Sequence, residues 1–279
     1  MTKCNFLITF LVKFKPIDNW KERVFNEYME TRMMPSITVI VPAYKKAKIL
    51  KSFVAIVTGA LEKLGFKDYE MFIITNADEN GIDDETSAVA RNLESNDIRI
   101  RAIHNPDYVN VGFKYRQGVD LAIKEYVTCI FCDSEVSEMT VTAVLAHIGE
   151  ADVVLSYTAN MESRTLFRRI LSQIFTGLCN LIYGLHMTYY NGTSIYPRAL
   201  LQSLDLNNDS FAYNVEAFVS AIKSHSKLTY KEVPVILNQG KTSGAAFKLN
   251  NVVGIGKTLL RLFWRVWFKR SHLIKISQL

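Results

Sequence analysis

Short apolar runs alternate with longer amphipathic runs over the first half of the chain. The short runs are rich in β-branched and other apolar residues, which is typical of buried strands. The predicted strands cover residues 36–42, 69–75, 98–103, 126–132 and 151–156. The longer runs repeat their apolar residues every three or four positions, and they predict helices at residues 49–64, 86–93, 111–124 and 141–148.

This alternation predicts a fold class. Strands that alternate with helices of about 10–15 residues form βαβ units and a mainly parallel sheet. We therefore expect an α/β fold in which residues 36–250 form one domain, preceded by an arm at residues 1–35. Ligands of such sheets bind beyond the carboxyl ends of the strands. Candidate site residues therefore follow three predicted strands, at positions 42–44, 75–78 and 133–135.

The pattern changes after residue 156. Residues 170–197 carry no formal charge if His186 is counted as neutral, and a helix is expected there up to about residue 186. Polar residues and glycines interrupt this helix, so burial in the domain or partial immersion at an interface fits better than a membrane span. A last short strand is predicted at residues 231–236.

The segment Asp133-Ser134-Glu135 is the strongest local signal of chemistry. Two carboxylates that follow a buried strand can share one divalent cation, which in turn bridges a diphosphate. A solvated acidic turn is the alternative for such a short motif. The nearby Cys129 and Cys132 are three residues apart on a predicted strand, so their side chains point to opposite faces and are expected to be buried thiols rather than metal ligands.

Several motifs together resemble family-2 glycosyltransferases of the GT-A type. They are residues 37–44 (ITVIVPAY), 105–118 (NPDYVNVGFKYRQG) and 131–135 (FCDSE), followed by 189–192 (YYNG), 214–216 (NVE) and 232–235 (EVPV). The later motifs resemble the branch that includes dolichyl-phosphate mannosyltransferases and bactoprenol glucosyltransferases. The resemblance implies a GT-A (Rossmann-like) single domain that moves a sugar from a UDP- or GDP-sugar, with inversion, to a membrane-associated acceptor such as polyprenyl phosphate.

The resemblance also assigns roles to residues. It implies that the nucleotide-sugar is bound by Pro42, Ala43, Tyr44, Asn76, Asp78, Gly112, Asp133 and Ser134. It implies a metal, Mg²⁺ or Mn²⁺, held by Asp133 and Glu135, and catalytic arginines Arg164, Arg168 and Arg169 that grip phosphates of the donor or of a lipid acceptor. For these arginines a solvated basic helix face is the alternative.

Two departures from the family pattern keep other hypotheses open. Lys45 and Lys46 stand where the family has Asn-Glu, and residues 76–79 read Asn-Ala-Asp-Glu instead of Asp-Asp-Gly-Ser. A catalytically weakened GT-A-fold protein, acting as a membrane-bound or partner-binding module, is therefore an alternative. No GxGxxG and no P-loop follows any predicted strand, which disfavours other nucleotide-using α/β enzymes.

The C-terminal segment predicts a membrane surface as a partner. Lys257, Arg261, Arg265 and Lys269 recur every four residues, between apolar residues and tryptophans. Residues 251–279 are therefore expected to form a basic amphipathic helix at a membrane interface, with peripheral location on the cytoplasmic face; a helix packed on the domain with its cations in water is the alternative. The formal net charge is +6, but the aromatic residues are not interleaved as a stacking platform, so no nucleic-acid partner is expected.

Overall fold

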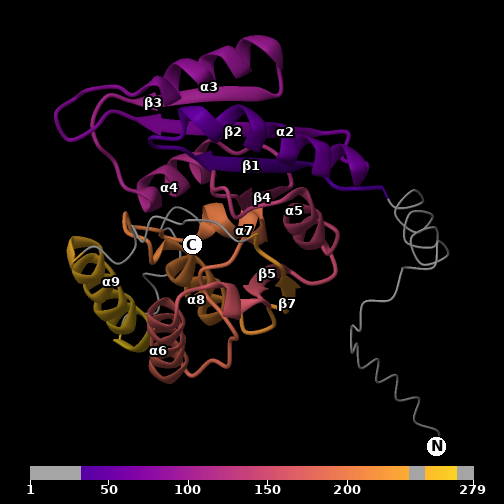
Figure 1. Cartoon of the computed structure of the whole chain (residues 1–279). Coiled ribbons are helices and arrows are strands. Elements are labelled where there is room, and N and C mark those ends of the chain that lie inside the picture. The colour runs from indigo at the N-terminus through magenta and orange to yellow at the C-terminus, as the bar shows by residue number, and fades with distance from the viewer. Residues whose placement is uncertain (1–32, 239–248, 269–279) are drawn as a thin grey trace, which may run out of the picture. The chain divides into compact units, whose positions relative to one another are not determined.

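The short apolar runs of the sequence form strands of one central sheet. The structure is a computed structural model, and it describes residues 33–238 and 249–268. Within these residues, seven strands lie side by side in the order β3-β2-β1-β4-β6-β5-β7 (Figure 1). They are β1 (Ile37–Pro42), β2 (Tyr69–Asn76), β3 (Ile100–Asn105), β4 (Tyr126–Cys129), β5 (Val153–Thr158), β6 (Ser194–Pro197) and β7 (Tyr230–Val235). β6 runs antiparallel to β4 and β5, and the other neighbouring pairs are parallel.

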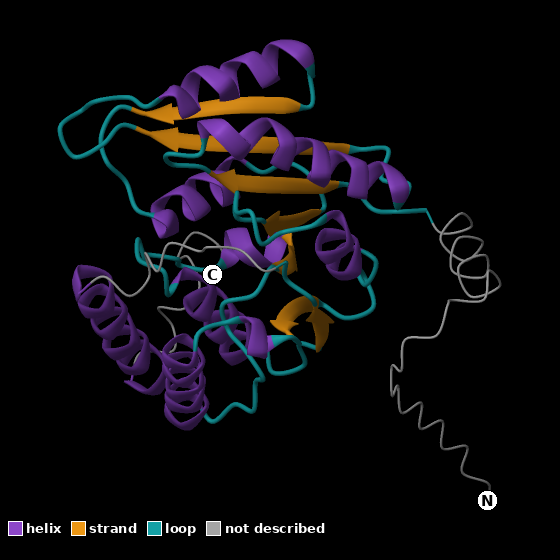
Figure 2. Cartoon of the chain, in the orientation of Figure 1, coloured by secondary structure: helices purple, strands orange, loops and turns teal. Residues whose placement is uncertain are grey.

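Helices cover both faces of this sheet (Figure 2). They are α2 (Ala47–Lys63), α3 (Glu85–Asn96), α4 (Val111–Leu121), α5 (Glu138–Leu145), α6 (Leu166–Tyr183), α7 (Arg198–Ser203), α8 (Tyr213–Ser224) and α9 (Leu249–Phe268). Helix α2 packs against α3 and α5, while α4, α7 and α8 pack against one another. The expected α/β fold with a mainly parallel sheet is confirmed.

The parallel strands follow the predicted pattern because burial decides their composition. Every residue of β1 is buried, as expected for a strand flanked by neighbours and covered on both faces. The edge strand β3 alternates between buried and exposed positions at its start, but it lies two residues later than predicted. Strand β4 ends at Cys129, three residues before the predicted end, although the Ile130 amide still donates to the Ile40 carbonyl at 2.9 Å.

The elements that the sequence pattern did not predict are β6, α7 and α8. Several of their polar side chains bond to distant partners, which no local period reveals. Ser194 of β6 donates to the Asn214 side chain of α8 at 2.7 Å, and Asn214 in turn donates to the Gly192 carbonyl at 2.9 Å. Gly192 itself lies so close to the Ser156 backbone that a Cβ would overlap it.

Helix α9 packs beside α6 and α8. The Tyr183 hydroxyl of α6 donates to the Leu259 carbonyl at 3.0 Å, and the Trp267 indole donates to the Ile182 carbonyl at 3.0 Å. The predicted helix at residues 251–279 is thus observed at Leu249–Phe268, and residues 269–279 lie outside the described part, as does nearly all of the predicted arm at 1–35. No helix in the described ranges combines the length and apolarity that crossing a bilayer requires.

Candidate active site

The carboxyl end of β1 brings Pro42, Ala43 and Tyr44 to the edge of the sheet. The Ala43 amide donates to the Ile74 carbonyl at 2.9 Å and so extends the pairing of β1 with β2 by one residue. Tyr44 is half-buried, and its ring meets the edge of Tyr108 with a centroid separation of 5.7 Å. Lys45 follows with a φ of +55°, a left-handed conformation that turns the chain away from the sheet.

A buried lysine beside this edge was missed by the sequence analysis. Lys114 of α4 is 3% exposed, and its ammonium donates to the Ala43 carbonyl at 3.1 Å. Its Nζ also lies 5.8 Å from the centroid of the Tyr44 ring. Burial lowers the pKa of Lys114 to about 8, so the group titrates near neutral pH. The sequence signal for its burial was its position four residues before Gly118. Residues four apart share one side of a helix, and Gly118 packs against Ile40 of the sheet.

The carboxyl end of β2 places Asn76 and Asp78 next to the β1 edge. Asn76 is buried and donates to the Ala77 carbonyl at 2.6 Å, while its Oδ1 has no hydrogen-bond partner among the described residues. Asp78 accepts from the backbone amides of Ile82 and Asn80 at 2.9 Å each, and these bonds lower the pKa of its carboxyl. Asp78 therefore orders its own loop, whereas the buried side-chain oxygen of Asn76 is left unsatisfied by the described residues.

Gly112 lies at the start of α4, against the loop that precedes α8. Its amide donates to the Asp209 carbonyl at 3.0 Å, and a Cβ at this position would overlap the Asn208 carbonyl and the Asp209 backbone. Arg116 of the same helix forms an ion pair with Asp209. These contacts explain a glycine here by close packing, and its predicted contact with the nucleotide stays a prediction.

Asp133, Ser134 and Glu135 lie on the loop between β4 and α5. Glu135 is 7% exposed, its carbonyl accepts from the Asn238 amide at 2.9 Å, and its Oε1 lies 3.4 Å from Nη1 of Arg168. Asp133 is half-buried, and Ser134 next to it is exposed. The structure thus joins two of the predicted groups, since an arginine of α6 reaches the predicted metal carboxylate.

The three predicted arginines lie at or before the start of α6. Arg164 donates to the Tyr189 hydroxyl at 3.1 Å, and its Nε is buried without a partner among the described residues. Arg168 contacts Glu135 as described, and Arg169 is half-buried in the next position. Thr165 caps the helix by accepting from the Arg168 amide. The helix start therefore carries positive charge both from guanidinium groups and from the helix dipole, which favours phosphate oxygens.

The donor set of this loop fits a magnesium or manganese ion only together with a substrate. Asp133 and Glu135 supply hard carboxylate oxygens, which these ions prefer. Among the described residues there is no group of three or more His, Cys, Asp or Glu side chains that could hold a metal. A cation here would therefore need oxygens of a diphosphate and of water to complete its shell, as Mg²⁺ commonly does.

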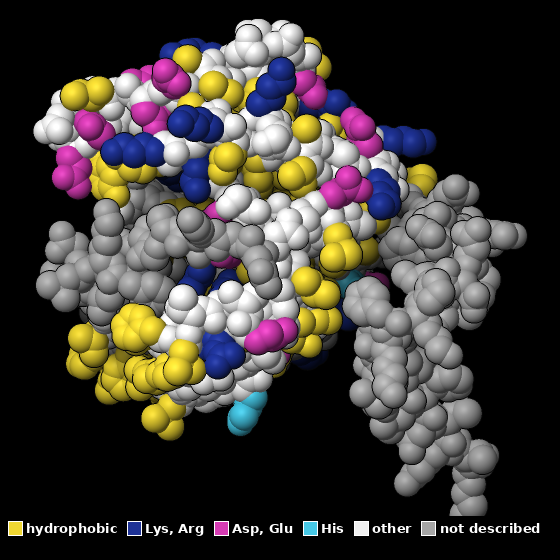
Figure 3. Space-filling view, in the orientation of Figure 1, with side chains coloured by type: hydrophobic (Ala, Val, Ile, Leu, Met, Phe, Trp, Pro, Cys, Tyr) yellow, Lys and Arg dark blue, Asp and Glu magenta, His cyan; other side chains and the backbone are white. Residues whose placement is uncertain are grey.

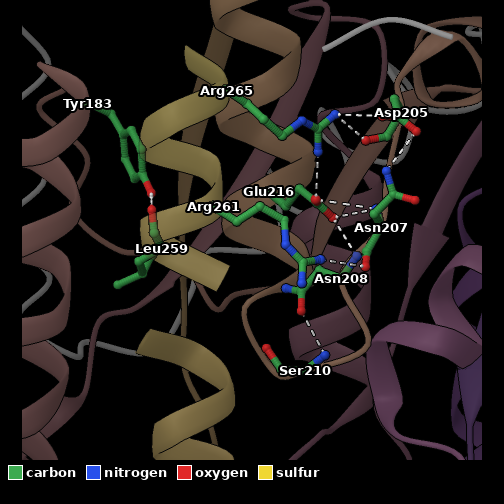
Figure 4. Close-up of polar contacts among 9 residues, drawn as sticks. All are labelled: Tyr183, Asp205, Asn207, Asn208, Ser210, Glu216, Leu259, Arg261 and Arg265. Carbon is green, nitrogen blue, oxygen red and sulfur yellow. Dashed lines mark hydrogen bonds and ion pairs between the residues drawn. The ribbon is translucent and has the colours of Figure 1, made fainter. Parts of the chain in front are cut away.

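A cluster of charged residues, two of them buried, joins α9 to the loop beside Gly112 (Figure 4). Arg265 is 8% exposed and donates to Glu216 at 3.1 Å and to Asp205 at 3.1 Å. We call these three residues the α9 anchor. Glu216 also accepts from the backbone amides of Asn207 and Asn208 at 3.1 and 3.0 Å. Burial raises the pKa of Glu216, although these amides and Arg265 oppose the shift.

The α9 anchor corrects the expectation for the C-terminal helix. The basic stripe was expected to meet lipid or water with all its members, but Arg265 turns inward and is paired. Arg261, one turn earlier, is exposed and makes one long bond of 3.5 Å to the Asn207 carbonyl. The side chains of Lys257 and Lys269 lie outside the described part. A period of four shows which residues share a side of a helix, but not which side the core takes.

Comparison with known proteins places this geometry in a family. The family model described as glycosyl transferase family 2 matches residues 38–211. Glycosyltransferase AglD of Haloferax volcanii is 24% identical over 242 residues, which cover 82% of this chain and 37% of that protein. The GalNAc(5)-diNAcBac-PP-undecaprenol beta-1,3-glucosyltransferase of Campylobacter jejuni is 25% identical over 214 residues, covering 71% of this chain and 63% of that protein. The chain thus spans less than two thirds of the length of either relative.

Solved structures agree on the fold. Glucosyl-3-phosphoglycerate synthase of Mycobacterium tuberculosis, in complex with Mg²⁺ and UDP, superposes with a TM-score of 0.62 at 11% identity, covering 88% of this chain and 82% of that one. The same enzyme in complex with Mn²⁺, UDP-glucose and phosphoglyceric acid superposes with a TM-score of 0.62 at 12% identity, covering 90% and 85%. At this identity the likeness shows the fold alone, and the expected GT-A fold is confirmed.

Proposed function

The chain belongs to glycosyl transferase family 2, and we propose that its site moves a sugar from a UDP- or GDP-sugar to a membrane-associated acceptor such as polyprenyl phosphate. The observation that carries this proposal is the contact between Glu135 and Arg168 at 3.4 Å. It places a carboxylate suited to a metal–diphosphate complex beside an arginine suited to an acceptor phosphate. Glu135 follows β4, whose carboxyl end lies beside that of β1, where the nucleoside would bind, and Arg168 reaches it from α6.

The residues divide the reaction between them. An oxygen of the acceptor forms a bond to the anomeric carbon while the bond from that carbon to the nucleoside diphosphate breaks, which inverts the configuration. A Mg²⁺ or Mn²⁺ ion bound by Asp133 and Glu135 would supply charge for the leaving diphosphate. Arg164, Arg168 and Arg169 would hold the acceptor phosphate in line with the breaking bond, and Tyr44 with Asn76 would bind the nucleoside.

The nature of the acceptor decides whether a base is required. A phosphate monoester is ionised at neutral pH and attacks without losing a proton to the protein. A sugar hydroxyl on a lipid carrier, the acceptor type in the name of the Campylobacter jejuni relative, would need a general base. Glu135 is already paired with Arg168 in this structure, which favours the phosphate acceptor. We also propose that the chain acts peripherally, on the cytoplasmic face of a membrane.

A thermal-shift titration tests the donor site. The purified chain is titrated with UDP, GDP and their common sugar conjugates, with and without manganese, beside the variant Asp133→Ala. Binding to the native state raises the melting temperature by mass action. We expect a manganese-dependent rise with one nucleotide class, which Asp133→Ala abolishes without lowering the melting temperature of the free protein.

The matched control is Asp107→Ala, which removes one exposed carboxylate from the loop before α4 and leaves the loop after β4 unchanged. If neither nucleotide class raises the melting temperature, this would contradict the donor site and would favour a non-catalytic module. If both classes bind in the presence of manganese, turnover with polyprenyl phosphate and with a polyprenyl-diphosphate-linked sugar then separates the two acceptor types.

A further inference from the structure

Helix α6 presents a row of apolar side chains to the outside. The exposed members are Leu166, Phe167, Ile170, Ile174, Leu178 and Leu181. Most are spaced by three or four residues, so they lie along one side of the helix. The opposite side carries Thr176, Cys179 and Tyr183, which are buried against the domain. Leu181 is the most exposed of the six, at 81%.

Helix α9 presents a similar row. The exposed members are Leu260, Phe263, Trp264, Trp267 and Phe268, while Leu262, Arg265 and Val266 are buried on the other side. Trp264 and Phe268 stack on each other with ring centroids 4.4 Å apart. The apolar side of α9 thus faces outward, and the side that carries the anchoring arginine faces the domain.

The two rows form one surface, which we call the α6–α9 face. The helices are joined by the bonds from Trp267 to the Ile182 carbonyl and from Tyr183 to the Leu259 carbonyl, each 3.0 Å long. Figure 3 shows hydrophobic side chains gathered over the region where Figure 1 draws α6 and α9. Contiguous apolar surface of this kind is rare in proteins without a partner, because water contact with it is unfavourable.

The chemistry of the face favours a lipid bilayer as its occupant. Neither α6 nor α9 contains an aspartate or a glutamate, whereas the half-buried Arg169 and the exposed Arg261 are among their residues. This excess of positive charge complements anionic headgroups. Leucines, phenylalanines and tryptophans on one side of a helix are typical of segments that lie in the plane of a membrane interface.

The position of the face relative to the proposed site favours the same occupant. Leu166 and Phe167 begin the apolar row of α6, and Arg168 follows directly with its contact to Glu135. A bilayer that covers the face would therefore lie beside the arginines proposed to hold the acceptor phosphate. A polyprenyl phosphate keeps its chain in the bilayer and its phosphate at the surface, so its charged end would be delivered to the helix start.

We propose that the α6–α9 face docks the chain on a lipid bilayer by inserting apolar side chains from both helices, with the α9 anchor holding α9 in place. The inference rests on the proposed function only in the choice of a lipid-borne acceptor. Because Arg265 is paired with Glu216 and Asp205, it is not available to headgroups. Docking is therefore driven mainly by apolar burial, and anionic lipid adds a smaller contribution.

Flotation of the full chain with lipid vesicles tests the face. Vesicles of phosphatidylcholine, with and without phosphatidylglycerol, are used at low and at high sodium chloride. The variants Leu178→Glu on α6 and Trp264→Glu on α9 place a charge in the face, and Ile98→Glu places the same charge at a fully exposed position outside it. We expect the wild type to float with both vesicles at both salt concentrations, and each face variant to partition at least about tenfold less. The control should partition like the wild type.

Several outcomes would overturn the docking proposal. These are the absence of flotation, flotation that disappears at high salt, and face variants that float like the control. Sedimentation velocity without vesicles gives a further one: a dimer that both face variants dissociate would assign the face to a second copy. The nucleotide titration is run on the same variants. A nucleotide shift without flotation would leave the donor site standing, and flotation without a shift would leave the face standing.

Discussion

The edge of the parallel strands and the α9 anchor both bury polar groups, but they satisfy them differently. At the strand edge, Lys114 has one recorded acceptor for its ammonium, and the Asn76 Oδ1 has no partner among the described residues. In the anchor, Glu216 accepts from Arg265 and from two backbone amides. Unsatisfied groups cost free energy unless a ligand completes them, so the first region is suited to binding and the second to holding a helix.

The largest expected effect is a loss of turnover at an unchanged melting temperature. Asp133→Ala removes a carboxylate from the proposed metal–diphosphate site, and we expect turnover to fall by about a thousandfold or more, roughly 4 kcal/mol in the barrier. The melting temperature should stay within the error of the wild type, because Asp133 is half-buried and lies on a loop. Steady-state turnover and thermal melting together measure this. A variant with near-wild-type turnover would end the metal assignment.

The second effect concerns stability at the anchor. Arg265→Leu leaves the buried Glu216 carboxylate without its guanidinium, and we expect the free energy of unfolding to fall by about 3–5 kcal/mol. Arg261→Leu is the matched control one turn away, with an expected change below about 1 kcal/mol because its one described bond is long and exposed. Denaturant unfolding measures both changes.

The double variant Arg265→Leu with Glu216→Gln sharpens this prediction, because glutamine removes the charge but keeps a side-chain oxygen for the Asn207 and Asn208 amides. If the cost of the single variant comes from an uncompensated buried charge, removal of the carboxylate as well should restore part of the lost stability. Additive losses in the double variant would instead mean that packing of the arginine side chain, and not its charge, holds α9 against the domain.

The smallest effect is a pH dependence at the strand edge. The folded chain releases the Lys114 proton at a pKa of about 8, whereas the ordinary value of 10.5 applies to the unfolded chain. Between these values the unfolded state binds more protons, so Lys114 makes stability rise with pH. Lys114→Met should remove this rise and stabilise the free protein at neutral pH by about 1–2 kcal/mol. Urea unfolding across pH 7–10 tests it, and an unchanged slope in the variant would contradict the assignment.

The sequence alone could predict the parallel half of the fold because its signals are local. Strands β1, β2 and β4 are short, mostly apolar runs, and the apolar residues of the helices between them repeat every three or four positions. The order of these elements puts their carboxyl ends at one edge of a sheet. Tyr44, Asn76 and Asp133 could therefore be proposed for one site before any coordinates were known.

The tertiary structure decided which buried groups have partners. The spacing of Lys114 from Gly118 indicates which side of α4 it occupies, but not its acceptor, because the Ala43 carbonyl lies 71 residues earlier in the sequence. Likewise, β6 could not be predicted from four residues, because the partner of its Ser194 side chain is Asn214 of α8.

Helix α9 shows most clearly what the sequence determines and what only the tertiary structure determines. Its sequence determined that a helix forms, that apolar and basic residues share defined sides, and that tryptophans lie among the apolar ones. It did not determine which side is buried, because that depends on Glu216 and Asp205, which lie 49 and 60 residues away. These carboxylates offset the desolvation of Arg265, so the arginine side turns inward and the aromatic side is left on the surface.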